Sequence, residues 1–302
     1  MFRGKGWVNL LLFILTILST YFVGFLWGIN YLFSDRELHE VSEVLDLSIF
    51  LEPSLMRLSL IYSVALLSIL LGHELGHYLT CRRYGIQATL PYFIPAPTLI
   101  GTLGALIKIK SPFTRKEELF DVGANGPLVG FLLSVPALYI GLLHSRMIPA
   151  LPRESSIFFG EPLLLKVFVW GIFGNTAQNQ DLILHPLAVA GWVGLLVTSF
   201  NLIPVGQLDG GHILYALFGE KTRKLAVGIV IILVILGIFC WAGWLIWALL
   251  IGLIGLKHPA ILDEGQQFSR KRKVLSLAVA LIFIFSFIPA PVSDSSLLDF
   301  FK

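Results

Sequence analysis

Long apolar segments constrain the fold of this sequence more than any other feature. Four of them, at 7–29, 56–80, 120–143 and 225–256, have at least the ~20 residues that a helix needs to cross the hydrocarbon core of a bilayer. Only 14% of the residues are charged, whereas about 25% are charged in a typical soluble domain. The sequence therefore predicts a polytopic membrane protein. Its net charge of +3 is too small to indicate nucleic-acid binding.

We expect an all-α polytopic membrane protein of about seven transmembrane spans, built as a single membrane-embedded domain over residues 1–302. The N-terminal span covers 7–29 and the core covers 57–218. The C-terminal spans lie at 225–256 and 274–287.

Basic residues predict how these spans are oriented. Arg3 and Lys5 precede the first span, so the positive-inside rule places the N-terminus in the cytoplasm. The apolar run at 225–256 is longer than one span needs, and a single helix there would put the basic cluster at 270–273 outside. We therefore predict a pair of short spans that turn near Trp241.

The second apolar run contains the motif His73-Glu74-Leu75-Gly76-His77. Residues four apart share one face of a helix, so His73 and His77 can offer two imidazoles to one metal ion. Glu74 stands beside them as a base able to take a proton from water. The alternative for a lone membrane histidine is a polar group that packs helices together. At this spacing a metal site is favoured, because each ionisable group costs at least ~2.5 kcal/mol near the bilayer centre.

A third metal ligand is needed, and cysteine does not supply it. Cys81 and Cys240 fall in or beside different apolar runs, so zinc would be held by histidine and carboxylate. One proline and three glycines within 204–211 interrupt the span that begins near 185, and Asp209 lies in this break. Asp209 is the strongest candidate ligand, and His212 is its rival.

Residues 84–118 remain apolar, but prolines and glycines break any helical pattern. The stretch at 99–110 looks like short strands, which we interpret as a small, partly re-entrant β-hairpin against the motif helix, near the active site. The alternative is a cytoplasmic loop of incidental apolarity. Lys108 and Lys110 place the region on the inner side in either case.

Two motifs flank this hairpin: His73-Glu74-Leu75-Gly76-His77, and the run from Asn201 to Gly211 with sequence NLIPVGQLDGG. Together they resemble the signature of the site-2 protease family of intramembrane zinc metalloproteases. The segments 101–104, 111–113 and 126–127 are similar to a branch with bacterial and chloroplast thylakoid members. That branch lacks a PDZ insert, and this chain has no room for a peptide-binding module of about 90 residues.

The resemblance implies one Zn²⁺ ion per chain, held by His73, His77 and Asp209. It also implies that Glu74 activates water, and that Asn201 steadies the substrate or the oxyanion during catalysis.

The extended stretch could bind an unwound substrate by strand addition. Gly101, Thr102 and Gly104 are the candidate substrate-binding residues.

The predicted function is hydrolysis of a peptide bond in or near a transmembrane segment of a membrane-protein substrate. The partners are such substrates, the lipid bilayer and candidate accessory membrane proteins, with no nucleic acid. One alternative is a catalytically inactive scaffold or chaperone of the same fold, and another is a metal-ion transporter, although no inverted repeat is apparent. No Ser- and Arg-rich leader precedes the first span, which favours a prokaryotic cytoplasmic membrane.

Overall fold

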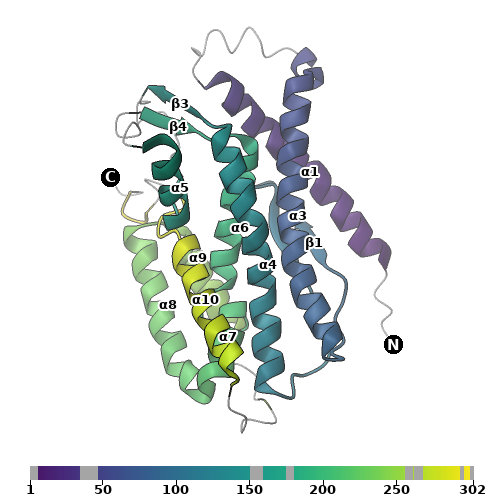
Figure 1. The fold of residues 1–302 in the computed structure, drawn as a ribbon, viewed down its shortest axis with the longest axis vertical. Helices are drawn as coiled ribbons and strands as arrows, with labels where there is room; N and C mark the ends of the chain where they lie inside the picture. Colours follow the sequence, from purple (N-terminus) through teal and green to yellow (C-terminus); the bar gives the residue numbers. More distant parts are fainter. Residues whose placement is uncertain are drawn as a thin grey trace.

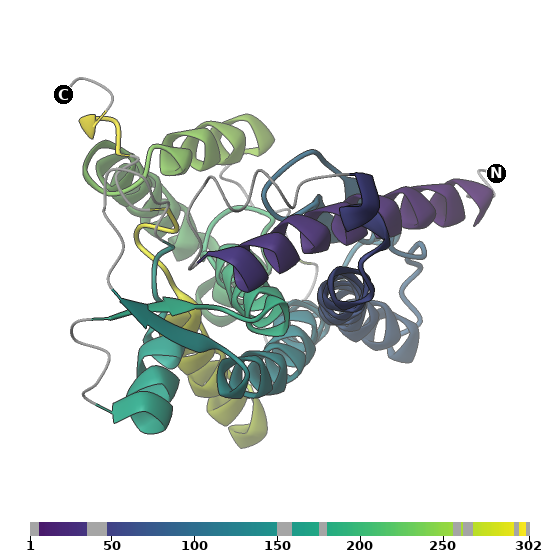
Figure 2. The ribbon, with the colours of Figure 1, turned by 90° about the horizontal axis from the view of Figure 1, so that it is seen from above.

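The computed structural model describes residues 6–34, 47–149, 159–174, 180–255, 261, 268–292 and 296–299. The described chain is mostly helical, and most of its long helices run side by side along the length of the molecule (Figure 1). The exception is α1, which crosses them obliquely (Figure 2). The helices are α1 (Gly6–Phe33), η1 (Leu47–Leu51), α3 (Pro53–Arg83), α4 (Lys116–Leu143), α5 (Leu163–Phe173), α6 (Pro186–Asn201), α7 (Asp209–Phe218), η4 (Gly219–Lys221), α8 (Thr222–Phe239), α9 (Gly243–Ile254) and α10 (Arg270–Ser286).

Four helical runs in the described residues are long and apolar enough to cross a membrane: Gly6–Phe33, Pro53–Arg83, Lys116–Leu143 and Asp209–Phe239. The first three confirm helices where the sequence predicted the first three spans. Seven spans are not confirmed. The 16 residues of α6 and the 12 residues of α9 give only about 24 and 18 Å of helix, less than the ~30 Å hydrocarbon core.

The predicted turn within 225–256 is confirmed. Helix α8 ends at Phe239 and α9 begins at Gly243. The two helices pack closely, because a Cβ on Gly237 would lie 2.6 Å from the Leu245 side chain. Trp244 is fully buried and donates its indole N–H to the Pro289 carbonyl at 2.7 Å, which connects this pair to the end of α10.

Helix α3 carries the first motif and lies at the centre of the packing, against α1, α4 and α6. Small residues allow these helices to approach closely. A Cβ on Gly24 of α1 would lie 2.8 Å from the Ser59 carbonyl, and one on Gly76 would lie 2.6 Å from the Asn125 carbonyl. The motif is therefore held on a rigid, closely packed helix.

The predicted β-hairpin is confirmed as an antiparallel pair, β1 (Tyr92–Pro95) and β2 (Thr102–Leu106). It packs against α1 and α3. Ser19 of α1 donates to the Gly101 carbonyl at 2.7 Å, and Tyr62 of α3 donates to the Ile100 carbonyl at 2.9 Å. These bonds tie the tip of the hairpin to both helices.

A second antiparallel pair was not predicted. It consists of β3 (Arg146–Pro149) and β4 (Gln180–Ile183) and lies at the opposite end of the molecule from α7 (Figure 1). Across the described residues between α3 and α6, these two small sheets are the only strands, so no inserted peptide-binding domain appears there.

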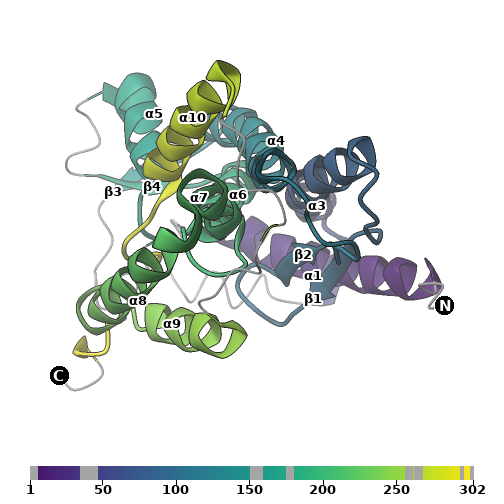
Figure 3. The same ribbon diagram turned by 90° about the horizontal axis from the view of Figure 1, so that it is seen from below.

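The predicted break after the span that begins near residue 185 is confirmed. Helix α6 ends at Asn201 and α7 begins at Asp209, with turns between them. Gly206 adopts a φ of +58°, which favours glycine, and Pro204 cannot continue a regular helix. Viewed from below, α7 lies beside α4, so the break returns the chain to the helix that packs against α3 (Figure 3).

Candidate metal centre

The structure brings together three of the residues predicted as metal ligands. His73 and His77 lie one turn apart on α3, and their Nε2 atoms are 3.1 Å apart. Asp209, the first residue of α7, places its Oδ2 atom 3.3 Å from each of these nitrogens. Both histidines are buried, and the Asp209 side chain is 15% exposed.

This triangle of atoms fits a zinc ion. Ligands bound tetrahedrally at 2.0–2.1 Å lie about 3.3–3.4 Å from one another, close to the separations found here. Two imidazoles and one carboxylate are also an established donor set for catalytic zinc, with the fourth position left for water or substrate. The described residues therefore suit a catalytic zinc site better than a closed structural one.

The tautomer of His77 supports this assignment. Its Nδ1 atom lies 2.7 Å from the carbonyl oxygen of Val122 on α4. A carbonyl can only accept, so Nδ1 carries the proton and the lone pair of Nε2 faces His73 and Asp209. Orienting a histidine ligand through its other ring nitrogen is a general device of metal sites.

Helix α4 forms the wall behind the two histidines. A Cβ on Gly126 would lie 2.1 Å from His77 Nε2, and one on Gly130 would lie 3.0 Å from His73 Nδ1. A Cβ on Gly123 would lie 3.2 Å from the Asp209 carbonyl. Three glycines on one helical face thus leave room for the ligands.

Tight turns position Asp209 at the start of α7. A Cβ on Gly210 would lie 2.1 Å from the Leu202 carbonyl, and one on Gly211 would lie 2.4 Å from the Gly206 carbonyl. Only glycine fits this close approach without a backbone shift. An acidic residue in the first turn of a helix also interacts favourably with the helix dipole.

Glu74 and Asn201 belong to the surroundings of the ligand triangle. Glu74 directly follows His73 on α3 and is 5% exposed. Asn201 ends α6 and places its amide nitrogen 3.3 Å from His73 Nε2. The site therefore combines a buried carboxylate and an amide with the three ligands.

His212 is not part of the ligand group found among the described residues. Its ring lies 6.1 Å from the ring of Phe113, and its Cβ faces Gly123. The structure therefore favours Asp209 over this rival ligand.

The three candidate substrate-binding residues have different surroundings. A Cβ on Gly101 would lie 2.9 Å from the Ser19 carbonyl of α1, so Gly101 serves helix packing. The hydroxyl of Thr102 donates to the Ile94 carbonyl at 2.8 Å and accepts from the Gly104 N–H at 3.0 Å. At Gly104, with a φ of +100°, an added Cβ would meet no atom within 4 Å, which leaves space beside the strand.

Sequence reasoning missed the supporting roles of Val122, Gly126 and Gly130. The sequence analysis used this region only at 126–127, as part of the family resemblance. Their spacing of four residues on one helical face was a readable signal for the two glycines. A backbone carbonyl such as that of Val122 leaves no trace in the residue type.

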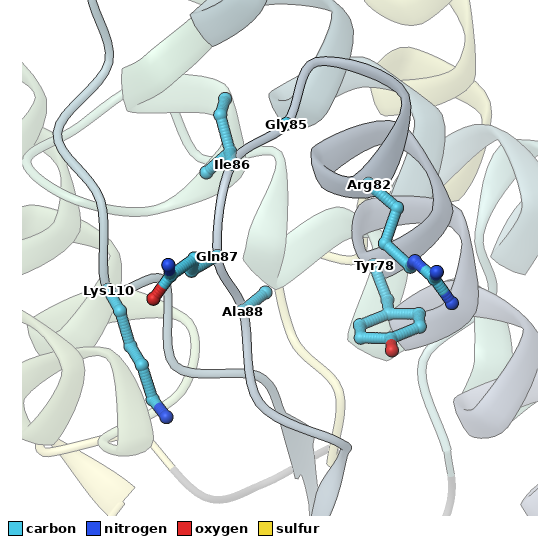
Figure 4. A pocket seen from close by; sticks show the side chains of 7 residues that line it. All are labelled: Tyr78, Arg82, Gly85, Ile86, Gln87, Ala88 and Lys110. Atoms are coloured by element: carbon cyan, nitrogen blue, oxygen red, sulfur yellow. The ribbon is translucent and has the colours of Figure 1, made fainter. Parts of the chain in front are cut away.

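A separate open cavity of about 360 Å³ lies at the C-terminal end of α3 (Figure 4). Its lining includes Tyr78 and Arg82 of α3 and, across from them, Lys110. None of the three zinc-ligand candidates lines it. The cavity is therefore distinct from the metal centre.

The sequence matches the family model described as Peptidase family M50 over residues 61–241. It is 36% identical over 226 residues to "Probable zinc metalloprotease EGY1, chloroplastic" of Arabidopsis thaliana, covering 71% of this chain and 40% of the relative. It is 34% identical over 157 residues to "Probable zinc metalloprotease EGY2, chloroplastic" of the same plant, covering 52% of this chain and 28% of the relative. The chain thus spans less than half the length of these curated relatives.

These relatives correct one expectation. A prokaryotic cytoplasmic membrane is wrong as the expected location, because the similar zinc metalloproteases are named as chloroplast proteins, which supports a plastid membrane. Basic residues beside a span report which side of a membrane they face, and the same bias does not distinguish one membrane from another. Since the family model matches more than half of the sequence, the chain belongs to peptidase family M50, the site-2 protease family of zinc metalloproteases.

Proposed function

We propose that this chain is an intramembrane zinc metalloprotease that hydrolyses a peptide bond in or near a transmembrane segment of a membrane-protein substrate. The observation that carries the proposal is the convergence of four polar side chains from three helices, with the buried carboxylic acid Glu74 next to one of them in the chain. The four are His73, His77, Asn201 and Asp209. From its relatives we further propose that the chain resides in a plastid membrane.

His73, His77 and Asp209 would hold one zinc ion per chain. Zinc, when bound there, supplies Lewis-acid polarisation of the scissile carbonyl and lowers the pKa of the attacking water. Val122 keeps the His77 ring oriented for this role through the bond to Nδ1.

Glu74 is the proposed general base. Its carboxylate takes a proton as the water oxygen bonds to the scissile carbon, and it returns that proton to the leaving amine as the C–N bond breaks. Asn201 can donate its amide hydrogen to the carbonyl oxygen as negative charge develops there. Both groups lie on rigid helices, which fixes their geometry relative to the ligands.

A helical substrate hides its carbonyls in intrahelical hydrogen bonds, so cleavage requires local unwinding. Strand β2 has β1 on one edge, and among the described residues no strand pairs with its other edge. We propose that this edge, near Gly104 and Thr102, binds the unwound segment by strand addition. The packing of β2 against α3 supports this, because α3 carries the proposed base.

The test compares cleavage of a single-span membrane protein in detergent by the native protein and by Glu74→Gln. We expect the variant to keep its zinc and to lose at least ~100-fold in kcat, the contribution of a positioned acid–base group. Glu52→Gln is the matched control, because Glu52 is exposed at the start of α3. Native-like cleavage by Glu74→Gln would contradict the mechanism. A native protein that binds zinc but cuts nothing would favour the scaffold alternative.

A further inference from the structure

A cluster of charged and hydroxyl groups joins three helix ends: the C-terminal end of α3 and the N-terminal ends of α4 and α10. Arg272, in the first turn of α10, donates from Nε and Nη2 to the two carboxylate oxygens of Asp121 at 2.9 and 2.8 Å. Its Nη1 atom donates to Glu117 at 2.5 Å. The Tyr84 hydroxyl, at the C-cap of α3, donates to Asp121 at 2.5 Å and accepts from Arg272 at 3.3 Å. One guanidinium thus binds groups from α3 and α4.

The charges of α4 explain why a cation is needed here. Glu117 and Asp121 are four residues apart on one face, where like charges repel. Glu118 is satisfied locally by Arg115 and the Thr114 backbone. In the described part of the chain, the recorded ion pairs of both Glu117 and Asp121 are with Arg272. A bidentate guanidinium–carboxylate pair is also geometrically specific, so it fixes orientation as well as charge.

The cluster adjoins the support of His77. Asp121 directly precedes Val122, whose carbonyl accepts the hydrogen bond from His77 Nδ1. Tyr84 lies seven residues, or two helical turns, after His77 on α3. Arg272 therefore ties together the two chain segments whose relative position sets the contact between His77 and Val122.

Tyr84 strengthens this link at neutral pH. Burial raises the pKa of its hydroxyl, and the neighbouring Asp121 carboxylate raises it further. The hydroxyl therefore remains protonated and can donate to Asp121.

From this geometry we infer that Arg272 is a positioning residue for the metal ligand His77, acting through Asp121 and Val122. Arg272 lies outside the residues matched by the family model, which end at 241. Helix α10 packs against α4 (Figure 3). Through Arg272, which also binds the Tyr84 hydroxyl at the end of α3, it would align α3 with α4 at the metal centre. This inference rests on the metal centre of the proposed function.

The experiment measures how fast a chelator removes zinc from the 302-residue chain, and records the visible spectrum of the cobalt-substituted protein. Loss of a group that hydrogen-bonds a metal ligand typically lowers metal affinity 10–100-fold. Arg272 acts on His77 through Asp121 and Val122, so we expect the lower end of this range: Arg272→Gln should release zinc about tenfold faster and shift the cobalt bands. Lys271→Gln and Lys273→Gln are matched controls, because both lysines are exposed on the same turn. Both should behave like the native protein.

A mutant cycle separates positioning from general destabilisation. Asp121→Asn should release zinc about as fast as Arg272→Gln, and the double variant should be no faster than either, because both changes break the Arg272–Asp121 pair on which the proposed positioning depends. Native-like zinc release and cobalt spectra in both single variants would overturn the inference.

If Arg272→Gln fails to fold, the same measurements are made on Arg272→Lys, because lysine keeps the charge but not the bidentate geometry. Native-like release from Arg272→Lys would then overturn it. A native protein that binds no zinc would instead contradict the proposed function.

Discussion

At the scale of single residues, the candidate metal centre depends on space that must stay free of side chains. The His77 ring lies directly over Gly126, where a Cβ would come within 2.1–2.5 Å of three ring atoms. Backbone and ring would both have to move to admit even alanine. The position of one ligand is thus set partly by the absence of a side chain on the facing helix.

We therefore expect Gly126→Ala to lose zinc and to destabilise the fold by about 1–3 kcal/mol, the usual range for overpacking. The measurement is zinc content beside thermal unfolding. Gly228→Ala in α8 is the control, because a Cβ there would meet no atom within 4 Å and alanine favours helix. A Gly126→Ala protein with native zinc content would show that the helices separate easily, contrary to this packing.

The second proposed catalytic role is that of Asn201 in stabilising the oxyanion. If its amide stabilises the developing oxyanion, Asn201→Ala should lower kcat by about 100-fold with little change in KM, because this interaction is made in the transition state. Zinc content should be unchanged, since the amide is not among the three ligand candidates. An effect confined to KM would assign Asn201 to substrate binding instead.

At the scale of elements, the two glycines of the hairpin differ in their surroundings. Gly101 packs on α1, whereas Gly104 faces open space and Leu103 is 70% exposed. The sequence grouped these glycines together, because both break a helix and both favour turns. Their different surroundings follow from where α1 crosses the sheet, which no local pattern reveals.

Gly104→Val should therefore reduce kcat/KM about tenfold more than Gly104→Ala, by crowding the edge where a substrate strand would pair. Alanine controls for the cost of adding a Cβ at a φ of +100°. Thermal unfolding of both variants is measured beside kcat/KM, because β-branched valine is more strained than alanine at this φ. Equal kcat/KM values for the two variants would argue against strand addition at this edge.

At the scale of the whole molecule, much of the architecture could be predicted from the sequence. The apolar runs predicted the long helices, and the prolines and glycines at 204–211 predicted the break that carries Asp209. The motif spacing predicted that His73 and His77 share a face. These features are local, and hydrophobicity or helical period determines them directly.

What could not be predicted depends on contacts between distant segments. The pairing of β3 with β4 joins segments about 35 residues apart, and the bond from Arg272 to Asp121 joins residues 151 apart. Four long helical runs match the length of a membrane span, and any further span stays a prediction. Short helices such as α9 have too few residues for their length to show whether they cross a membrane.

The central claim is that His73, His77 and Asp209 hold a catalytic zinc ion. It is tested most directly by zinc content and zinc-edge X-ray absorption of the purified native protein, beside Asp209→Ala and His212→Ala. The account predicts about one zinc per chain with nitrogen and oxygen ligands at about 2.0–2.2 Å and no sulfur. Zinc should persist in His212→Ala and be lost in Asp209→Ala. A native protein without zinc, or an Asp209→Ala protein with the native spectrum, would contradict the account.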